Sequence, residues 1–233
     1  MYERSFTMFN LFKNFFYSHK PLTYKAAINL VYDNNIHTLR NRIKILIVDD
    51  EEFDIVHILQ ERKYDVYYKK DIIYALEAEP FDIIIIDIKG VASALGGTMG
   101  GFTVAEEIKK RYPAKQVFCY SASVINQEIA SKLIHLDGYI RKDTDVDEWC
   151  QKLDGIITTY CSRDYQIKKL REQLQACNVS EENISNVITE YKNNLDGKNF
   201  TSVIDQLTAL IDNSKVLFSL IKFIYSSVEY FAA

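Results

Sequence analysis

Three aspartates follow two apolar runs and could bind a cation together. Asp49 and Asp50 come directly after Ile43-Lys-Ile-Leu-Ile-Val48, and Asp87 ends the run Phe81-Asp-Ile-Ile-Ile-Ile-Asp87. Such runs are typical of strands buried in a parallel sheet, whose carboxyl ends meet at one edge. Carboxylates gathered there repel one another unless a cation neutralises them, and Mg²⁺ prefers oxygen ligands. The pattern favours a Mg²⁺ site over simple helix capping by Asp49 and Asp50.

Alternating strand and helix patterns predict the sheet that would position these acids. The expected strands are 43–48, 64–68, 81–87, 116–121 and 138–141, and the expected helices are 52–62, 71–78, 102–112, 124–135 and one that begins near Asp145. This alternation is typical of an α/β fold with a five-stranded parallel, doubly wound sheet and helices on both faces.

Five of the eight glycines lie within the fourteen residues after Asp87. A segment of this composition has little intrinsic structure, so we expect an irregular and mobile loop. It lacks the Gly-Lys-Ser/Thr ending of a nucleotide-binding loop. Two interpretations stay open, a solvated insertion and a lid or partner-docking loop beside Asp87.

Residues 1–42 predict an N-terminal helical extension. Phe6, Phe9, Phe12 and Phe16 recur at helical spacing, and the segment has six lysines and arginines against two acids. A basic, aromatic helix of this kind could make peripheral contact with a membrane. Packing of the aromatic face against the rest of the protein, or against a second copy, is favoured.

Residues 160–233 predict a C-terminal helical region. Apolar residues from Val146 to Cys177 keep a helical spacing, broken only at Arg163, and predict one continuous helix that leaves the sheet. Ser180 is placed to cap a second helix, and a third is expected from about Asn199, with an apolar stripe as far as Phe231. Two or three helices could not bury so much apolar surface between themselves, so we predict a homodimer.

Composition excludes several functional classes. The chain of 233 residues has a net charge of −4, and residues 160–233 contain eight basic against nine acidic side chains, so no nucleic-acid partner is expected. The four cysteines lack C-x-x-C spacing and predict reduced, buried thiols, consistent with a cytoplasmic protein. The four histidines are scattered, which disfavours a zinc site.

Four motifs, in order along residues 43–159, resemble the receiver domain of bacterial two-component response regulators. Ile-Leu-Ile-Val-Asp-Asp at 45–50 resembles the acidic metal-binding pair, and Ile-Ile-Ile-Ile-Asp at 83–87 resembles the strand with the phospho-accepting aspartate. Tyr-Ser-Ala at 120–122 is similar to the strand that ends in the switch hydroxyl. Gly-Tyr-Ile-Arg-Lys at 138–142 resembles the strand that carries the switch aromatic residue and a lysine.

The resemblance implies a flavodoxin-like fold for residues 43–159 and a Mg²⁺ site at its acidic edge. Asp50 and Asp87 would bind the ion directly and Asp49 through water, and a backbone carbonyl near Lys89 would complete the protein ligands. The chain departs from the family in its longer glycine-rich loop and its shorter early helices. Asp143 also stands where a cis-proline usually follows the lysine.

The resemblance also implies how the site would work. Asp87 would accept a phosphoryl group from a histidine kinase or a phosphotransfer protein, and Lys142 would pair with Asp87 and then with the phosphate. Ser121 would donate its hydroxyl to the phosphoryl group, and Tyr139 would rotate as the switch. Such a protein is a response regulator and not an enzyme in the turnover sense. The alternative is a degenerate receiver that acts as a phosphorylation-independent protein-interaction module.

Overall fold

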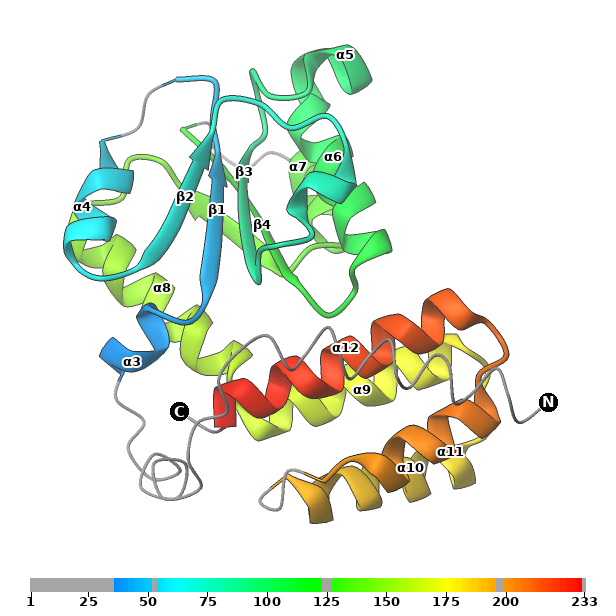
Figure 1. The fold of residues 1–233 in the computed structure, drawn as a ribbon. Helices are drawn as coiled ribbons and strands as arrows, with labels where there is room; N and C mark the ends of the chain where they lie inside the picture. The colour runs from blue at the N-terminus through cyan, green and yellow to red at the C-terminus, as the bar shows by residue number, and fades with distance from the viewer. Residues whose placement is uncertain (1–35, 52–53, 123–126, 196–198, 232–233) are drawn as a thin grey trace.

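The computed structural model describes residues 36–51, 54–122, 127–195 and 199–231 (Figure 1). The predicted aromatic face from Phe6 to Phe16 lies outside these residues. The short helix α3 (Ile36–Arg40) is the described end of the predicted N-terminal extension. Its Leu39 is buried in the core under the sheet, so at least this part of the extension packs with the sheet.

Five parallel strands form a single sheet in the order β2-β1-β3-β4-β5. The strands are β1 (Lys44–Val48), β2 (Asp65–Lys69), β3 (Ile83–Asp87), β4 (Gln116–Ser121) and β5 (Gly138–Arg141). This is the strand order of flavodoxin-like folds, in which ligands bind at the carboxyl ends of the strands. The predicted α/β fold with a parallel, doubly wound sheet is therefore confirmed.

Helices cover both faces of the sheet (Figure 1). On one face lie α3, α4 (Ile55–Glu61) and α8 (Val146–Tyr160), and on the other lie the 3₁₀ turn η1 (Ala75–Ala78), α6 (Gly100–Arg111) and α7 (Gln127–Leu133). Alternate strand residues point to opposite faces. Phe118 and Tyr120 of β4 therefore lie in the core beneath α8, whereas Val117 and Cys119 lie beneath α6.

The predicted helix at 71–78 is wrong, because only a 3₁₀ turn forms at Ala75–Ala78. Side chains in this segment bond to nearby backbone groups and compete with a helix. Glu77 accepts from the amides of Ile73 and Tyr74, and Asp71 accepts from the amides of Ile72 and Ala92. The last of these bonds ties the segment to the glycine-rich loop.

The glycine-rich loop is not irregular, contrary to the prediction. It folds into the short helix α5 (Ser93–Gly96) and the 3₁₀ turn η2 (Gly97–Met99), directly before α6. Val91 and Ala92 are fully buried in the core beneath α6. These tertiary contacts give the segment a structure that its composition does not encourage.

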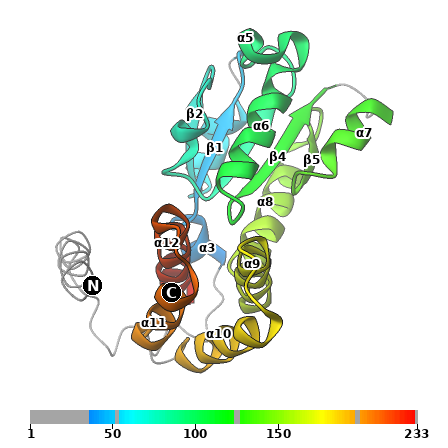
Figure 2. The same cartoon turned by 90° about the vertical axis from the view of Figure 1, so that its right-hand side faces the viewer.

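The described residues after 160 form four further helices that pack around a core of their own (Figure 2). They are α9 (Arg163–Ala176), α10 (Glu181–Asn194), α11 (Thr201–Leu210) and α12 (Ser214–Phe231). The predicted cap at Ser180 is confirmed, because its side chain accepts from the amide of Asn183. The predicted start of a helix near Asp145 is also confirmed, and the structure shows that Asp145 caps α8 by accepting from the amide of Glu148.

Two predicted helices are each broken into two. The continuous helix from Asp145 to Cys177 is wrong, because α8 ends at Tyr160 and Ser162 caps α9 by accepting from the amide of Tyr165. The single helix from Asn199 is likewise divided at Asn213, whose side chain accepts from the amides of Lys215 and Val216. A polar side chain that binds the free amides of a new first turn starts a new helix.

The break at Ser162 separates the predicted apolar seam into two parts. Trp149 and Leu153 of α8 are buried against the sheet, whereas Leu170 and Leu174 of α9 are buried among α10, α11 and α12. These apolar side chains of the seam are therefore buried within one chain. The excess of apolar surface from which we predicted a homodimer is not present among these side chains.

The four cysteines are free thiols. Cys119, Cys150 and Cys161 are buried as predicted, whereas Cys177 is only half-buried. Burial raises the pKa of the Cys119 and Cys161 thiols to about 12. Thiols of this kind are protonated at neutral pH and poorly reactive. In the part of the chain that the structure describes, no helix is long and apolar enough to cross a bilayer.

The four-helix group meets the sheet near the amino ends of the strands. Lys222 of α12 forms an ion pair of 2.9 Å with Glu79, and Ala114 packs against the core of the helices. Lys115 lies at this contact. Its ammonium donates to the carbonyl of Glu79 at 2.8 Å and to the carbonyl of Phe81.

We expect Lys115 to make the stability of this contact depend on pH. Burial lowers the pKa of Lys115 from 10.5 to about 8. Between these values the unfolded chain keeps a proton that the folded chain has lost, so the free energy of unfolding should rise with pH. The slope is at most about 1.4 kcal/mol per pH unit.

Urea unfolding of the wild type and of Lys115→Met at pH 7.5, 8.5 and 9.5 would measure the effect. Both proteins contain the same tyrosines. Subtracting one free energy of unfolding from the other therefore removes the contribution of tyrosine titration. The wild type should gain stability relative to Lys115→Met as the pH rises. Parallel pH profiles would contradict the prediction.

Candidate functional site

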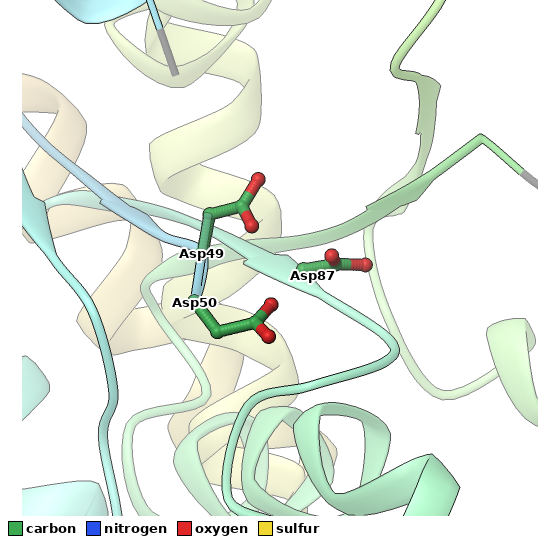
Figure 3. A group of neighbouring side chains, drawn as sticks. All are labelled: Asp49, Asp50 and Asp87. Carbon is green, nitrogen blue, oxygen red and sulfur yellow. The ribbon is translucent and has the colours of Figure 1, made fainter. Parts of the chain in front are cut away.

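The three predicted acids meet at the carboxyl edge of the sheet (Figure 3). Asp49 and Asp50 follow β1, and Asp87 is the last residue of the adjacent strand β3. One carboxylate oxygen of each lies within 4.8 Å of the others. Asp49 and Asp87 are buried, whereas Asp50 is exposed, so the cluster opens to solvent on the side of Asp50.

Lys142 lies between the two buried acids. Its Nζ is 2.5 Å from Asp87 Oδ2 and 2.8 Å from Asp49 Oδ2. The contact with Asp87 agrees with the predicted pairing, and the contact with Asp49 was not predicted. Lys142 reaches both acids although Asp143, and not proline, follows it in the sequence.

One ammonium shared between two carboxylates does not neutralise the site. Burial acts to lower the pKa of Lys142, but its hydrogen bonds to Asp49 and Asp87 outweigh burial and raise that pKa. Burial raises the pKa of the Asp87 carboxyl, although hydrogen bonds from Lys142 and from the Lys89 amide oppose this shift. Lys142 therefore stays charged, and three carboxylates against this one ammonium leave a deficit of positive charge.

The donor set suits a hard divalent cation. All three acidic groups offer oxygen, and among the described residues no histidine or cysteine joins the cluster. Mg²⁺ is commonly bound through one or two carboxylates while it keeps several waters. The exposed side at Asp50 leaves room for such waters, so the residues present fit the predicted ion.

The remaining predicted residues surround this cluster. Ser121 is buried at the end of β4, and its backbone carbonyl accepts from the Lys142 amide at 3.1 Å and from the Tyr139 hydroxyl at 2.8 Å. Ser121 thus connects Lys142 and Tyr139 through its main chain. The Lys89 amide donates to Asp87 Oδ1 at 3.2 Å, which places Lys89 in the turn directly after the acid.

Two tyrosines that the sequence analysis missed hold Asp49. The Tyr120 hydroxyl donates to Asp49 Oδ2, and the Tyr68 hydroxyl donates to the backbone carbonyl of Asp49 at 2.7 Å. Asp49 Oδ1 also accepts from the Glu51 amide at 3.0 Å. Tyr120 is the first residue of the Tyr-Ser-Ala motif at 120–122. Its alternation with Ser121 indicates that it points to the opposite face of the sheet, but not that it meets Asp49.

At two glycines, Gly90 in the loop after β3 and Gly101 in the first turn of α6, the backbone lies close to the acids. Gly90 has a φ of +83°, and a Cβ placed there would lie 2.1 Å from Asp50 Oδ1. A Cβ on Gly101 would lie 1.8 Å from the backbone oxygen of Asp87. The glycine cluster near Asp87 was the sequence signal, and its physical reason is this close approach rather than mobility.

Comparison with known proteins by sequence finds no matching family model and no matching curated protein.

Comparison by structure finds receiver domains. A CheY-like response regulator receiver domain protein from Methanospirillum hungatei JF-1 is 21% identical with a TM-score of 0.42, over 51% of this chain and 95% of that one. The receiver domain of NtrX from Brucella abortus is 25% identical with a TM-score of 0.42, over 49% and 98%. The Vibrio cholerae chemotaxis protein CheY4 is 20% identical with a TM-score of 0.40, also over 49% and 98%.

Proposed function

We propose that this chain is a response regulator in which Asp87 accepts a phosphoryl group in the presence of Mg²⁺. The observation that carries the proposal is the convergence of Asp49, Asp50 and Asp87 within 4.8 Å, with Lys142 in contact with two of them. A buried carboxylate beside a fixed ammonium, in an acidic cluster that opens to solvent at Asp50, is an arrangement suited to phosphoryl transfer to a carboxylate.

In this proposal each residue of the site has a distinct role. An oxygen of Asp87 would form a bond to the phosphorus of an acyl phosphate, and the bond from phosphorus to the leaving carboxylate would break. Lys142 would move its contact from Asp87 to the new phosphoryl oxygens, which carry the added negative charge. The Ser121 hydroxyl would donate to the same group, and Tyr139 would change position as the switch.

Asp49, Asp50 and Asp87 would hold Mg²⁺, together with a backbone carbonyl near Lys89. When bound, the ion would supply positive charge that offsets repulsion between the carboxylates and an anionic phosphodonor. In the cell the donor would be a histidine kinase or a phosphotransfer protein. No nucleic-acid partner is proposed, and we expect the protein to work in the cytoplasm.

Intact mass spectrometry tests the proposal directly. The full chain, incubated with acetyl phosphate and Mg²⁺, should gain the mass of one phosphoryl group, and peptide mapping should place it on Asp87. Chelation of the metal should prevent the gain. If no phosphoryl group is taken up under either condition, the alternative of a degenerate, phosphorylation-independent interaction module is favoured.

A change at Asp50 should remove metal binding without unfolding the chain. Asp50 is the exposed acid of the cluster, and Asp50→Ala removes one of three repelling charges, so stability should stay unchanged or rise. Asp54→Ala is a matched control, because Asp54 is exposed and its side chain makes no capping hydrogen bond in α4. Calorimetric titration with Mg²⁺ should show heat for the control and none for Asp50→Ala. An unchanged isotherm in Asp50→Ala would mean that the acids do not form a metal site.

We further propose that a receiver unit, residues 43–159, acts on the helical region, residues 160–233. A homodimer remains a prediction, although its basis has changed. Leu170 and Leu174 are buried inside the chain's own helices, so a dimer would have to use other surfaces. Light scattering with and without a phosphate analogue and Mg²⁺ would report the oligomeric state.

A further inference from the structure

A buried side chain connects the acidic cluster to helix α8. The Tyr120 hydroxyl donates to Asp49 Oδ2, and the Tyr120 ring packs edge-on against the indole of Trp149, with centroids 6.1 Å apart. Tyr120 and Trp149 are both fully buried. Since close-packed interiors transmit displacements between neighbours, a shift of Asp49 has a direct route to α8.

Lys142 shares its oxygen partner with Tyr120. Its Nζ lies 2.8 Å from Asp49 Oδ2, the atom to which Tyr120 donates, and 5.0 Å from the centroid of the Tyr120 ring. The Lys142 ammonium would be repelled by a dication held among the three carboxylates. If Lys142 moved, Asp49 would lose the positive charge beside it, and the Tyr120 ring would lose the cation over its face.

We propose that Tyr120 is a positioning residue whose hydroxyl fixes Asp49 and conveys metal occupancy of the acidic cluster to Trp149 in the first turns of α8. This inference rests on the proposed function, because it requires a divalent cation at Asp49, Asp50 and Asp87. It assigns the coupling to a single hydroxyl on the face of β4 opposite to Ser121. Helix α8 leads through Ser162 into α9, so the connection points towards the helical region.

The chain has a single tryptophan, which makes this route measurable. Tryptophan emission of the full chain can be followed during titration with Mg²⁺, while calorimetry records binding in the same buffer. Tyr120→Phe removes the hydroxyl and keeps the ring against Trp149. Tyr64→Phe is the matched control, because Tyr64 is also buried. Its hydroxyl also donates to a carboxylate, that of Asp154 at 2.7 Å, but away from the cluster.

The wild type and Tyr64→Phe should both change their emission as Mg²⁺ binds. In Tyr120→Phe calorimetry should still detect Mg²⁺ binding, with lower affinity because Asp49 has lost one hydrogen bond, and the emission change should be lost even when Mg²⁺ saturates the site. A full emission change in Tyr120→Phe would overturn the role of the hydroxyl. If both variants lost the emission change, the change would depend on the general packing of α8 and not on the Tyr120 hydroxyl. This result would also overturn the inference.

The proposed function fails in a different way. If calorimetry shows no Mg²⁺ binding by the wild type, the metal site is absent, and the proposed role of Tyr120 is refuted as well. If the metal binds to the wild type but the emission does not change, the proposed function stands and the coupling through Tyr120 is refuted.

Discussion

Asp87→Asn should abolish phosphoryl uptake completely. Asparagine has nearly the same shape as aspartate, but its amide lacks the carboxylate charge and is a poor nucleophile, so the attacking group is lost while the fold is kept. Lys142 would keep its contact with Asp49, and removal of one of three adjacent charges relieves repulsion. The fold of the variant should therefore be at least as stable as that of the wild type at neutral pH.

Asp82→Asn provides the matched control for this variant. Asp82 directly precedes β3, at the opposite end of the strand from Asp87, where its side chain accepts from the Lys44 amide at 2.9 Å. The oxygen of asparagine can accept the same hydrogen bond. Asp82→Asn should take up one phosphoryl group as the wild type does. Equal mass gain in Asp87→Asn and the wild type would show that another carboxylate is the acceptor.

Gly101→Ala should destabilise the protein, although alanine is the better residue for a helix. Gly101 lies in the first turn of α6, where a Cβ would meet the backbone oxygen of Asp87 at 1.8 Å. Either α6 or the end of β3 must move, and overpacking of this kind costs about 1 to 3 kcal/mol. The displacement should also reduce phosphoryl uptake, because it moves Asp87 relative to Lys142.

Gly155→Ala should have the opposite effect on stability. Gly155 lies within α8, it is exposed, and a Cβ there would have no neighbour within 4 Å. Alanine should therefore add about 1 kcal/mol to the free energy of unfolding, through helix propensity alone. Urea unfolding of the two variants gives the comparison. An increase in stability for Gly101→Ala would mean that α6 does not pack on Asp87 as described.

Much of the acidic site could be predicted because it depends on local sequence. An apolar run that ends in an acid specifies a buried strand with a carboxylate at its end, and in a parallel sheet all such ends lie on one edge. For this reason Asp49, Asp50 and Asp87 could be placed together before the fold was known. The pairing of Lys142 with Asp87 was predicted only through the family resemblance, since spacing alone does not indicate it.

The helical region shows where local patterns are insufficient. The apolar spacing from Val146 to Cys177 is interrupted only at Arg163, and we predicted one helix across this gap. The structure instead divides it, because the residues before Ser162 pack on the sheet and those after it pack on the other helices. Ser162 and Asn213 carry side chains suited to capping, but a cap is used only where the chain must change direction.

The sequence by itself determined the five strands, the acids at the ends of β1 and β3, the start of a helix near Asp145 and the cap at Ser180, since each of these follows from neighbours along the chain. Tertiary structure alone decided that the segment after β3 packs against Asp50 and the backbone of Asp87 and that Tyr120 bonds to Asp49. It also decided that the apolar helices bury one another. These features depend on contacts between residues far apart in sequence, where packing and the exclusion of water outweigh local preference.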